Sequence, residues 1–248
     1  MERYSDYDNF AWLYNKEWIQ FAENIFPGLK GIAGKTLPDG AKVLDLCCGT
    51  GQLAKILTDN GYKVTGIDGS TKMLKYAREN APKARFITAD ARAFKLPQVY
   101  DVVFSTFDSL NHIMTLPELQ QVFKNVYHCL VKGGIFIFDM TTKTHFKTQI
   151  QDYQQISETP DYFYTMHVVY DIENKICRWH CTIFRRRVRG WRRTDISLQQ
   201  TFYANAEIKT ALKKSGFNNI RTYPISRENQ PQKTTRNAVR IFYYAEKH

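Results

Sequence analysis

The sequence predicts a doubly wound α/β fold, in which helices cover both faces of a mostly parallel sheet. Between residues 41 and 140, short apolar segments alternate with stretches of helical periodicity. The apolar segments have no regular polar face, which is typical of parallel strands that are buried on both sides. After residue 139 the pattern changes to long segments rich in β-branched and aromatic residues, which predict an inserted antiparallel sheet.

Seven strands are expected in the main sheet, at 42–46, 63–67, 85–88, 101–105, 134–139, 218–224 and 238–245. Helices are expected between them, at 52–60, 71–80, 117–129 and 205–215, and Gly216 ends the last one. The inserted sheet follows the fifth strand and spans about residues 155–203, with strands at 162–170, 175–187 and 191–203. No linker and no internal repeat divides the chain, so residues 1–248 are expected to form a single domain.

Residues 1–35 are expected to form an N-terminal cap. Aromatic side chains recur at helical spacing, among them Tyr7, Phe10, Tyr14, Trp18 and Phe21. Ordinary packing would explain most of them. The alternative is a cap over the carboxyl edge of the sheet, where open α/β sheets bind their ligands.

The composition of the chain indicates where in the cell the protein is located. Of the 248 residues, 43% are apolar and 24% are charged, and no apolar segment approaches the roughly 20 residues of a membrane span. The first ten residues lack the pattern of a secretion signal. The five cysteines form no C-x-x-C pair and have no histidines at zinc-ligand spacing. We therefore expect a cytoplasmic protein with reduced cysteines, no membrane partner and no metal.

The most specific signal is the segment VLDLCCGTGQLA. A strand ends near Asp45, the residues Gly49-Thr50-Gly51 make a tight turn, and a helix begins at Gln52. Glycines let the backbone approach a ligand closely, and the free amides of the helix start favour polar or anionic groups. The turn also fits the loose dinucleotide-binding pattern, so by itself it leaves the ligand open.

Two further acids sharpen this site. Asp68 ends the second strand, where a carboxylate can accept hydrogen bonds from two ribose hydroxyls, and Asp90 ends the third, where it can accept from an adenine amino group. Each aspartate alone could equally be a helix cap or a turn residue. Asp45, Asp68 and Asp90 together, at the ends of three successive strands, predict a site for an adenosine-bearing ligand.

These features resemble the class I S-adenosylmethionine-dependent methyltransferases, especially the small-molecule branch that includes sugar-amine and amino-acid N-methyltransferases. The family's acid and glycine-rich turn correspond to residues 45–51, and its later strand motifs to GIDGSTKML, Asp90-Ala91, YDVVFSTFDSLNHI and LVKGGIFIFDM. YDNFAWLYN is similar to the cap segment of that branch. The resemblance implies a Rossmann-like fold, S-adenosylmethionine as cofactor, and an inserted sheet that acts as a lid over the acceptor.

The resemblance also implies the cofactor-binding residues, which are Tyr14, Asp45, Cys47, Gly49, Thr50, Gly51, Asp68, Gly69, Ser70, Met73, Asp90, Ala91, Arg92, Thr106 and Phe107. One departure is Cys47, where the family usually has glycine. We therefore expect a backbone at Cys47 that does not require a positive φ.

His112 is the candidate catalytic base, because it follows the fourth strand and imidazole titrates in the useful range. A base is needed only if the acceptor is a protonated amine or a hydroxyl, and a surface or helix-capping histidine is the alternative. The candidate substrate contacts are Tyr7, Asp108, His145, His167 and Trp179.

The charge of the chain is compatible with two kinds of methyl acceptor, a small molecule and a nucleic acid. The net charge of +11 divides into +3 for residues 1–150 and +8 for residues 151–248, and six arginines lie between 185 and 193. These arginines could be a solvated hairpin tip, could bind an anionic acceptor, or could bind RNA. A small-molecule acceptor, an amine for preference, is the main prediction, and nucleic-acid methylation is the alternative. The oligomeric state and the number of methyl transfers stay open.

Overall fold

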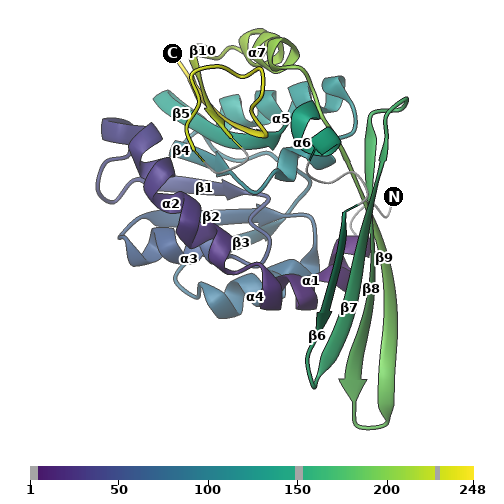
Figure 1. The fold of residues 1–248 in the computed structure, drawn as a ribbon. Helices are drawn as coiled ribbons and strands as arrows, with labels where there is room; N and C mark the ends of the chain where they lie inside the picture. The colour runs from purple at the N-terminus through teal and green to yellow at the C-terminus, as the bar shows by residue number, and fades with distance from the viewer. Residues whose placement is uncertain (1–4, 149–152, 227–229) are drawn as a thin grey trace.

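The computed structural model describes residues 5–148, 153–226 and 230–248. In this part of the chain a seven-stranded sheet has the order β10-β11-β5-β4-β1-β2-β3 (Figure 1). Its strands are β1 (Lys42–Leu46), β2 (Lys63–Asp68), β3 (Arg85–Thr88), β4 (Tyr100–Ser105), β5 (Leu130–Thr141), β10 (Asn218–Ile225) and β11 (Arg240–Glu246). The first five are parallel, and β11 runs antiparallel to both of its neighbours.

Helices cover both faces of this sheet, as its strand pattern predicts. They are α2 (Gln20–Ala33), α3 (Gln52–Asp59), α4 (Thr71–Asn80), α5 (Leu116–Cys129) and α7 (Asn205–Lys214). Successive strand side chains point to opposite faces, so Leu44 and Phe136 pack with α5 and α7. Val43 and Ile135 pack with α2 and α3 on the other face. The doubly wound, Rossmann-like prediction is confirmed.

The helix starts follow ordinary capping chemistry. The Ser70 hydroxyl accepts a hydrogen bond from the Met73 amide and so caps α4. The Thr115 hydroxyl accepts from the Glu118 amide at the start of α5. Each cap satisfies an amide that the helix itself leaves without a partner. Both helices therefore begin within one residue of the predicted positions.

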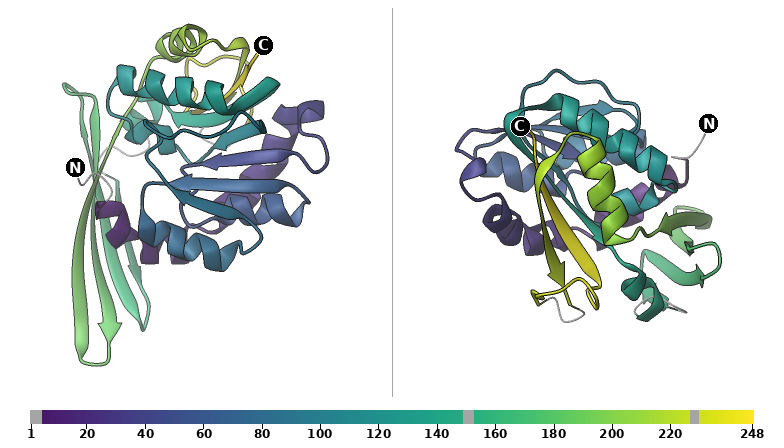
Figure 2. Two further views of the ribbon diagram at one scale, coloured as in Figure 1. Left: turned by 180° about the vertical axis from the view of Figure 1, so that it is seen from behind. Right: turned by 90° about the horizontal axis from the view of Figure 1, so that it is seen from above.

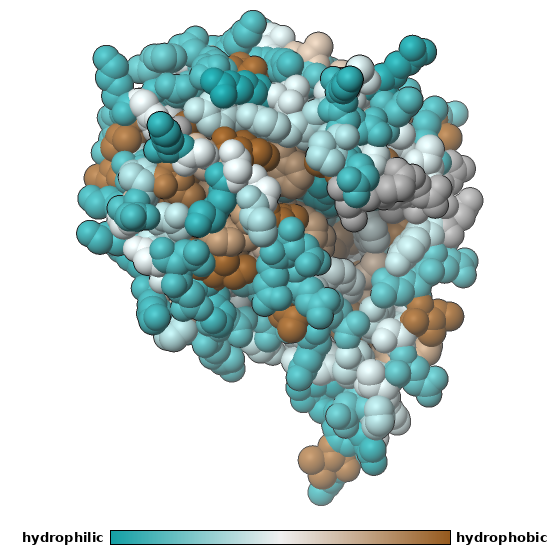
Figure 3. Space-filling model, turned by 60° about the vertical axis from the view of Figure 1, so that its left-hand side comes forward, coloured by the Kyte–Doolittle hydropathy of each residue, from teal (hydrophilic) through white to brown (hydrophobic). Residues whose placement is uncertain are grey.

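The inserted antiparallel sheet, hereafter the lid sheet, has the order β6-β7-β8-β9. Its strands are β6 (Gln154–Glu158), β7 (Tyr162–Asp171), β8 (Ile176–Arg187) and β9 (Gly190–Thr201). Figures 1 and 2 show the lid sheet standing beside the main sheet and projecting past the core. In Figure 3 this projection is mostly hydrophilic, with a hydrophobic group near its end. The lid sheet agrees with the predicted insertion, except that strand β6 was not predicted.

The predicted N-terminal cap divides into two helices with different positions. Helix α1 (Ser5–Glu17) lies between α4 and the lid sheet, whereas α2 covers a face of the main sheet. The short elements η1 (Gly34–Thr36), η2 (Ser109–His112) and α6 (Lys143–Thr148) complete the described elements. No described helix has the length and apolar character needed to cross a membrane.

Candidate active site

A cavity of about 800 Å³ lies where the carboxyl ends of the parallel strands meet α1 and the lid sheet. The main sheet contributes the segments that follow β1, β2, β3 and β4. Helix α1 contributes Tyr7, Phe10 and Tyr14, and the lid sheet contributes Met166, Trp179 and the segment 197–200. A cleft at this edge is where open α/β sheets bind ligands.

The turn after β1 is held by Asp68 of β2. The Asp68 carboxylate accepts hydrogen bonds from the amides of Gly49 and Ser70, each at 2.9 Å. At Gly51, where φ is +83°, an added Cβ would lie 2.9 Å from Cα of Ala77. Only glycine combines that dihedral angle with so close an approach to α4.

The expectation for Cys47 is wrong, because its φ is +60°. The neighbouring hydrogen bonds, from the Cys48 amide to the Ile67 carbonyl and from the Gly51 amide to the Cys48 carbonyl (both 2.9 Å), fix the turn. Tertiary contacts therefore hold a residue with a Cβ in a conformation that favours glycine.

Asp45 lies behind this turn and is only 2% exposed. Its Oδ2 has no hydrogen-bond partner among the described residues. Burial, and secondarily the charge of Asp68, raises the pKa of Asp45 to about 8. Burial also raises the pKa of Asp68. A buried carboxyl group at Asp45 and a partly buried one at Asp68, both with raised pKa values, favour a cationic ligand, which would stabilise their charged forms.

Asp90 is engaged inside the protein. Its carboxylate accepts hydrogen bonds from Nε of Arg92 at 3.0 Å to each oxygen, and Arg92 Nη1 donates to Glu118 at 2.7 Å. Ala91 and Arg92 line the cavity, but Asp90 does not. The Asp90 carboxylate therefore orients the Arg92 side chain, and an adenine contact at Asp90 stays a prediction.

The structure divides the predicted cofactor residues into two groups. Those that line the cavity are Tyr14, Cys47, Gly49, Asp68, Gly69, Met73, Ala91, Arg92 and Phe107. Those that lie behind its wall are Asp45, Thr50, Gly51, Ser70, Asp90 and Thr106. The second group shapes the wall: the Thr106 carbonyl, for example, accepts from the Ser109 hydroxyl at 2.8 Å.

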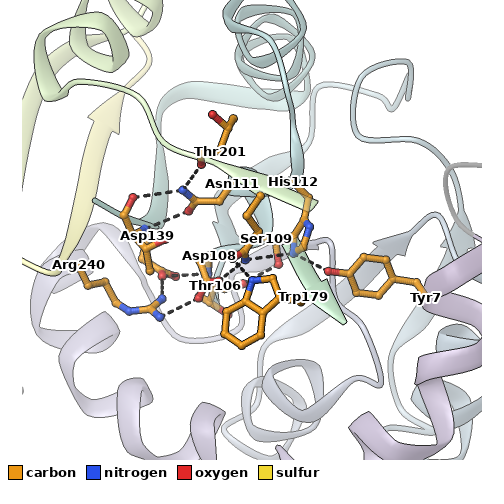
Figure 4. A network of polar contacts seen from close by, with 12 residues as sticks. Tyr7, Thr106, Asp108, Ser109, Asn111, His112, Asp139, Trp179, Thr201 and Arg240 are labelled. Carbon is orange, nitrogen blue, oxygen red and sulfur yellow. Dashed lines mark hydrogen bonds and ion pairs between the residues drawn. The ribbon is translucent and has the colours of Figure 1, made fainter. Parts of the chain in front are cut away.

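His112 ends η2 and lines the cavity. Its Nδ1 lies 2.7 Å from the Gln199 carbonyl. A carbonyl only accepts, so Nδ1 carries the hydrogen and Nε2 is left as an acceptor. The Tyr7 hydroxyl donates to Nε2 at 2.5 Å (Figure 4). Burial lowers the pKa of His112, against an opposing effect of Asp108, so the ring is neutral near pH 7.

A network of polar side chains stands beside His112. Gln200 Nε2 donates to Asp108 Oδ2 at 2.6 Å and approaches His112 Nε2 at 3.2 Å, while Gln200 Oε1 accepts from Trp179 Nε1 at 2.9 Å. Arg240 donates to Asp108 at 2.7 Å and to the fully buried Asp139 (Figure 4). Burial raises the pKa of Asp108, but Arg240 outweighs that effect and the net shift is downward. Asp108 is therefore ionised near pH 7.

Comparison with known proteins agrees with this geometry. Residues 43–134 match a family model described as a methyltransferase domain. The chain is 26% identical over 216 residues to the YqeM protein of Bacillus subtilis, covering 86% of each chain. It is 29% identical over 102 residues to a dTDP-3-amino-3,4,6-trideoxy-alpha-D-glucopyranose N,N-dimethyltransferase of Streptomyces venezuelae, covering 41% and 43% of the two chains.

The fold is shared with a S-adenosylmethionine-dependent methyltransferase from Clostridium acetobutylicum. The TM-score is 0.79 at 21% identity, and the match covers 97% of this chain and 98% of the other. Residues 43–134 are thus a methyltransferase domain, in a chain with the fold of the S-adenosylmethionine-dependent methyltransferases. The glycine-rich turn, Asp68 and the carboxyl-edge cavity of this methyltransferase are its candidate cofactor site.

The residues of the methyltransferase fit a cationic adenosyl cofactor. The orphaned Oδ2 of Asp45 and the raised pKa values of Asp45 and Asp68 suit a positively charged ligand. Gly49 has a φ of +51°, which favours glycine, and it lies against the ring of Tyr14, where an added Cβ would be 3.6 Å from that ring. No group of three or more His, Cys, Asp or Glu that could hold a metal ion occurs in the described ranges.

The predicted substrate contacts are brought together with one exception. Tyr7, Asp108, His145 and Trp179 line the cavity. Burial lowers the pKa of His145 to about 4, so this ring is neutral. His167 is exposed and does not line the cavity. Its neighbour Met166 does, and adjacent strand residues point to opposite faces, so His167 lies on the outer face of the lid sheet.

Two residues of this network, Gln200 and Arg240, were not predicted from the sequence. Gln200 lies in β9 with only 4% exposure, and a glutamine inside a strand carries no signal of a role at a distant site. Arg240 begins β11. An arginine at the start of an otherwise apolar strand is the one local signal that could have marked it, because a buried guanidinium needs carboxylate partners.

Proposed function

We propose that this methyltransferase transfers the methyl group of S-adenosylmethionine to an amine nitrogen of a small molecule, with His112 as the base. The observation that carries the proposal is the state of His112. Its Nδ1 is committed to a carbonyl, its Nε2 is an acceptor at the cavity wall, and burial keeps the ring neutral. A neutral imidazole in that orientation can remove a proton from an ammonium group.

The cofactor would be held by the turn after β1, Asp68, and the cavity residues that follow β3 and β4. When bound, S-adenosylmethionine supplies a methyl group that its sulfonium already activates. The protein then has to align the acceptor and exclude water. The aromatic side chains of Tyr7, Phe10 and Tyr14 on α1 supply the apolar wall for that purpose.

Tyr7 and Asp108 support the base in different ways. Burial raises the pKa of Tyr7 well above its usual value, so its hydroxyl stays protonated and donates to Nε2 until an acceptor takes its place. The ionised Asp108 favours the imidazolium that proton transfer creates at His112. Gln200 fixes the distance between Asp108 and His112, because its side-chain amide nitrogen contacts both residues.

The charge of the cavity favours an amine over an anion. Its two guanidinium groups, Arg92 and Arg240, are both paired with carboxylates. An anionic acceptor would have to compete with Asp90, Glu118 or Asp108 for them. An amine instead meets the ionised Asp108. The sugar-amine relative points to the same acceptor class.

The nucleic-acid alternative gains no support from this geometry. It requires the basic hairpin to contribute to the acceptor site, but the arginines between residues 185 and 193 do not line the cavity. A small-molecule acceptor needs no such contribution.

The test is methyl transfer from labelled S-adenosylmethionine to amino sugars and to their hydroxyl analogues. We expect transfer to the amines, and His112→Gln should lower kcat by about 100-fold, the lower end for a lost base. Its cofactor affinity, measured by calorimetry, should stay within about twofold of the unsubstituted protein. His167→Gln is the matched control, since that ring lies on the outer face, and it should leave kcat unchanged. Equal transfer to the hydroxyl analogues, or equal kcat for both variants, would contradict the proposal.

A further inference from the structure

A second concave site lies outside the methyl-transfer cavity. It is a groove of about 340 Å³ between α1, α4 and the β8–β9 hairpin. Figure 1 shows α1 between α4 and the lid sheet at this end of the core. The lining residues used below are Lys72 and Lys75 from α4, Arg185, Arg187 and Arg192 from the hairpin, and Asp8 from α1. We call this surface the basic groove.

Five cations converge on the basic groove from two segments that are more than 100 residues apart in sequence. None of the five forms an ion pair with a described acidic residue. The groove has one acid, Asp8, and its Oδ1 already accepts from the Ser70 hydroxyl at 2.5 Å and the Lys72 amide at 3.3 Å. Converging like charges disfavour the folded state unless an anion compensates them.

The arginines are arranged to present their charge to the groove. Arg185 lies over the ring of Trp12 at 4.0 Å, which restricts its guanidinium to the wall beside α1. Arg185 and Arg187 are two residues apart in β8, so both point to the face that meets α1. Guanidinium groups bind phosphate oxygens through paired hydrogen bonds, and lysines add charge without a fixed direction. Phosphate is therefore the chemistry that this set recognises best.

Helix α1 separates the basic groove from the cavity. Tyr7, Phe10 and Tyr14 face the cavity, while Asp8 and Trp12 line the groove on the other side of the helix. A small acceptor that fills the cavity cannot also reach the groove through α1. The groove is thus a separate site from the cavity of the methyl acceptor.

The groove fits a small oligophosphate better than a polymer. A nucleic-acid strand would need a continuous track of unpaired cations along the hairpin. Arg193 is instead paired with Asp195 at 2.9 Å, and Arg186 lies on the opposite face of β8 from Arg185 and Arg187. The unpaired cations gather in one hollow whose volume is that of a small ligand.

We propose that the basic groove binds a di- or triphosphate group, either free or carried by a nucleotide, at a site separate from the methyl-transfer cavity. The proposal does not depend on the identity of the methyl acceptor. It would stand if the amine proposal failed, because no residue of the groove takes part in methyl transfer.

Calorimetry on the full chain tests it, with S-adenosylhomocysteine present at saturation so that nucleotides cannot enter the adenosyl site. The probes are inorganic pyrophosphate, uridine diphosphate, uridine and a single-stranded oligonucleotide. We expect pyrophosphate and uridine diphosphate to bind and uridine not to bind. Equal affinities would indicate a site for the phosphates alone, and a higher affinity for uridine diphosphate would indicate a nucleotide site. Binding of the oligonucleotide without either phosphate probe would overturn the proposal.

A matched pair of variants locates the site. Lys75→Ser with Arg187→Ser should weaken pyrophosphate binding at least tenfold. Arg186→Ser with Arg189→Ser removes the same charge from the hairpin outside the groove and should change it less than twofold. An unchanged affinity for S-adenosylhomocysteine shows that each variant is folded, and Arg192→Ser replaces the first pair if it is not. Equal losses in both pairs would mean that the net charge, and not the groove, binds phosphate.

Discussion

Three residues with side chains have a positive φ in the cavity wall: Cys47 at +60°, Phe107 at +62° and Asp108 at +46°. Such conformations cost on the order of 1–2 kcal/mol each for residues other than glycine. At Asp108 the positive φ permits hydrogen bonds that offset this strain. Its amide donates to Asp139 at 3.0 Å, while its carboxylate accepts from Arg240 and Gln200. The backbone strain thus lies in the tight turns whose side chains line the cavity.

Asp45 predicts a pH dependence of cofactor binding. Its pKa of about 8 in the folded chain lies above the ordinary 3.8, so the folded carboxyl holds a proton between about pH 4 and pH 8 that an unfolded one has lost. Its contribution to the stability of the ligand-free protein therefore falls as pH rises through that window. A cationic cofactor favours the ionised form, so binding below pH 8 should release this proton. The affinity for S-adenosylmethionine should rise with pH, by up to about tenfold per unit.

Proton release can be measured by calorimetry at pH 6.5 in two buffers that differ in ionisation enthalpy. The unsubstituted protein should release protons on binding, and Asp45→Asn should abolish that release while leaving a neutral side chain of the same shape. Equal proton release by the two proteins would assign the linkage to another group.

At the scale of elements, the periodicity of apolar residues predicts much of the fold, because the pattern within each helix or strand shows which of its faces is buried. The helix at Thr71–Asn80 begins and ends where the sequence pattern places it. Strand β6 was missed because its burial alternates between partly buried and exposed residues, which leaves it without an apolar signal. Gln200 and Arg240 were missed for a different reason. Their partners lie 92 and 132 residues away at Asp108, and no local pattern encodes such a pairing.

Helix α1 is tied to the lid sheet by one carboxylate. Glu17 accepts hydrogen bonds from the hydroxyls of Tyr162 and Tyr164 in β7. Hydrogen bonds to a charged group contribute about 1.5–3 kcal/mol, so Glu17→Ala should loosen α1 before it affects the core. We expect amide hydrogen exchange in α1 to accelerate roughly tenfold, with exchange in β4 and β5 unchanged. Glu23→Ala removes an exposed acid from α2 and serves as the control. Unaltered exchange in α1 would show that aromatic packing alone holds this helix.

At the scale of the whole molecule, the adenosyl site predicts which ligands stabilise the fold. A ligand at about 100 times its Kd adds about 2.7 kcal/mol to the free energy of unfolding. For a chain of this size that should raise Tm by roughly 5–10 °C. S-adenosylmethionine and S-adenosylhomocysteine should both produce this rise in a thermal-shift measurement, and NAD should not. A comparable rise in Tm with NAD would instead indicate that the glycine-rich turn binds a dinucleotide.

The position of β11 in the main sheet determines when the last ion pairs of the acceptor site can form. β11 lies between β5 and β10 in the sheet, although it follows both along the chain. During synthesis β10 therefore emerges before the strand that joins it to the rest of the sheet. Arg240 arrives with β11, so until then Asp108 and Asp139 face each other without their shared counter-charge. The ion pairs that orient Asp108 at the acceptor end of the cavity therefore depend on the last strand to join the sheet, whereas the turn after β1 is held by contacts with β2.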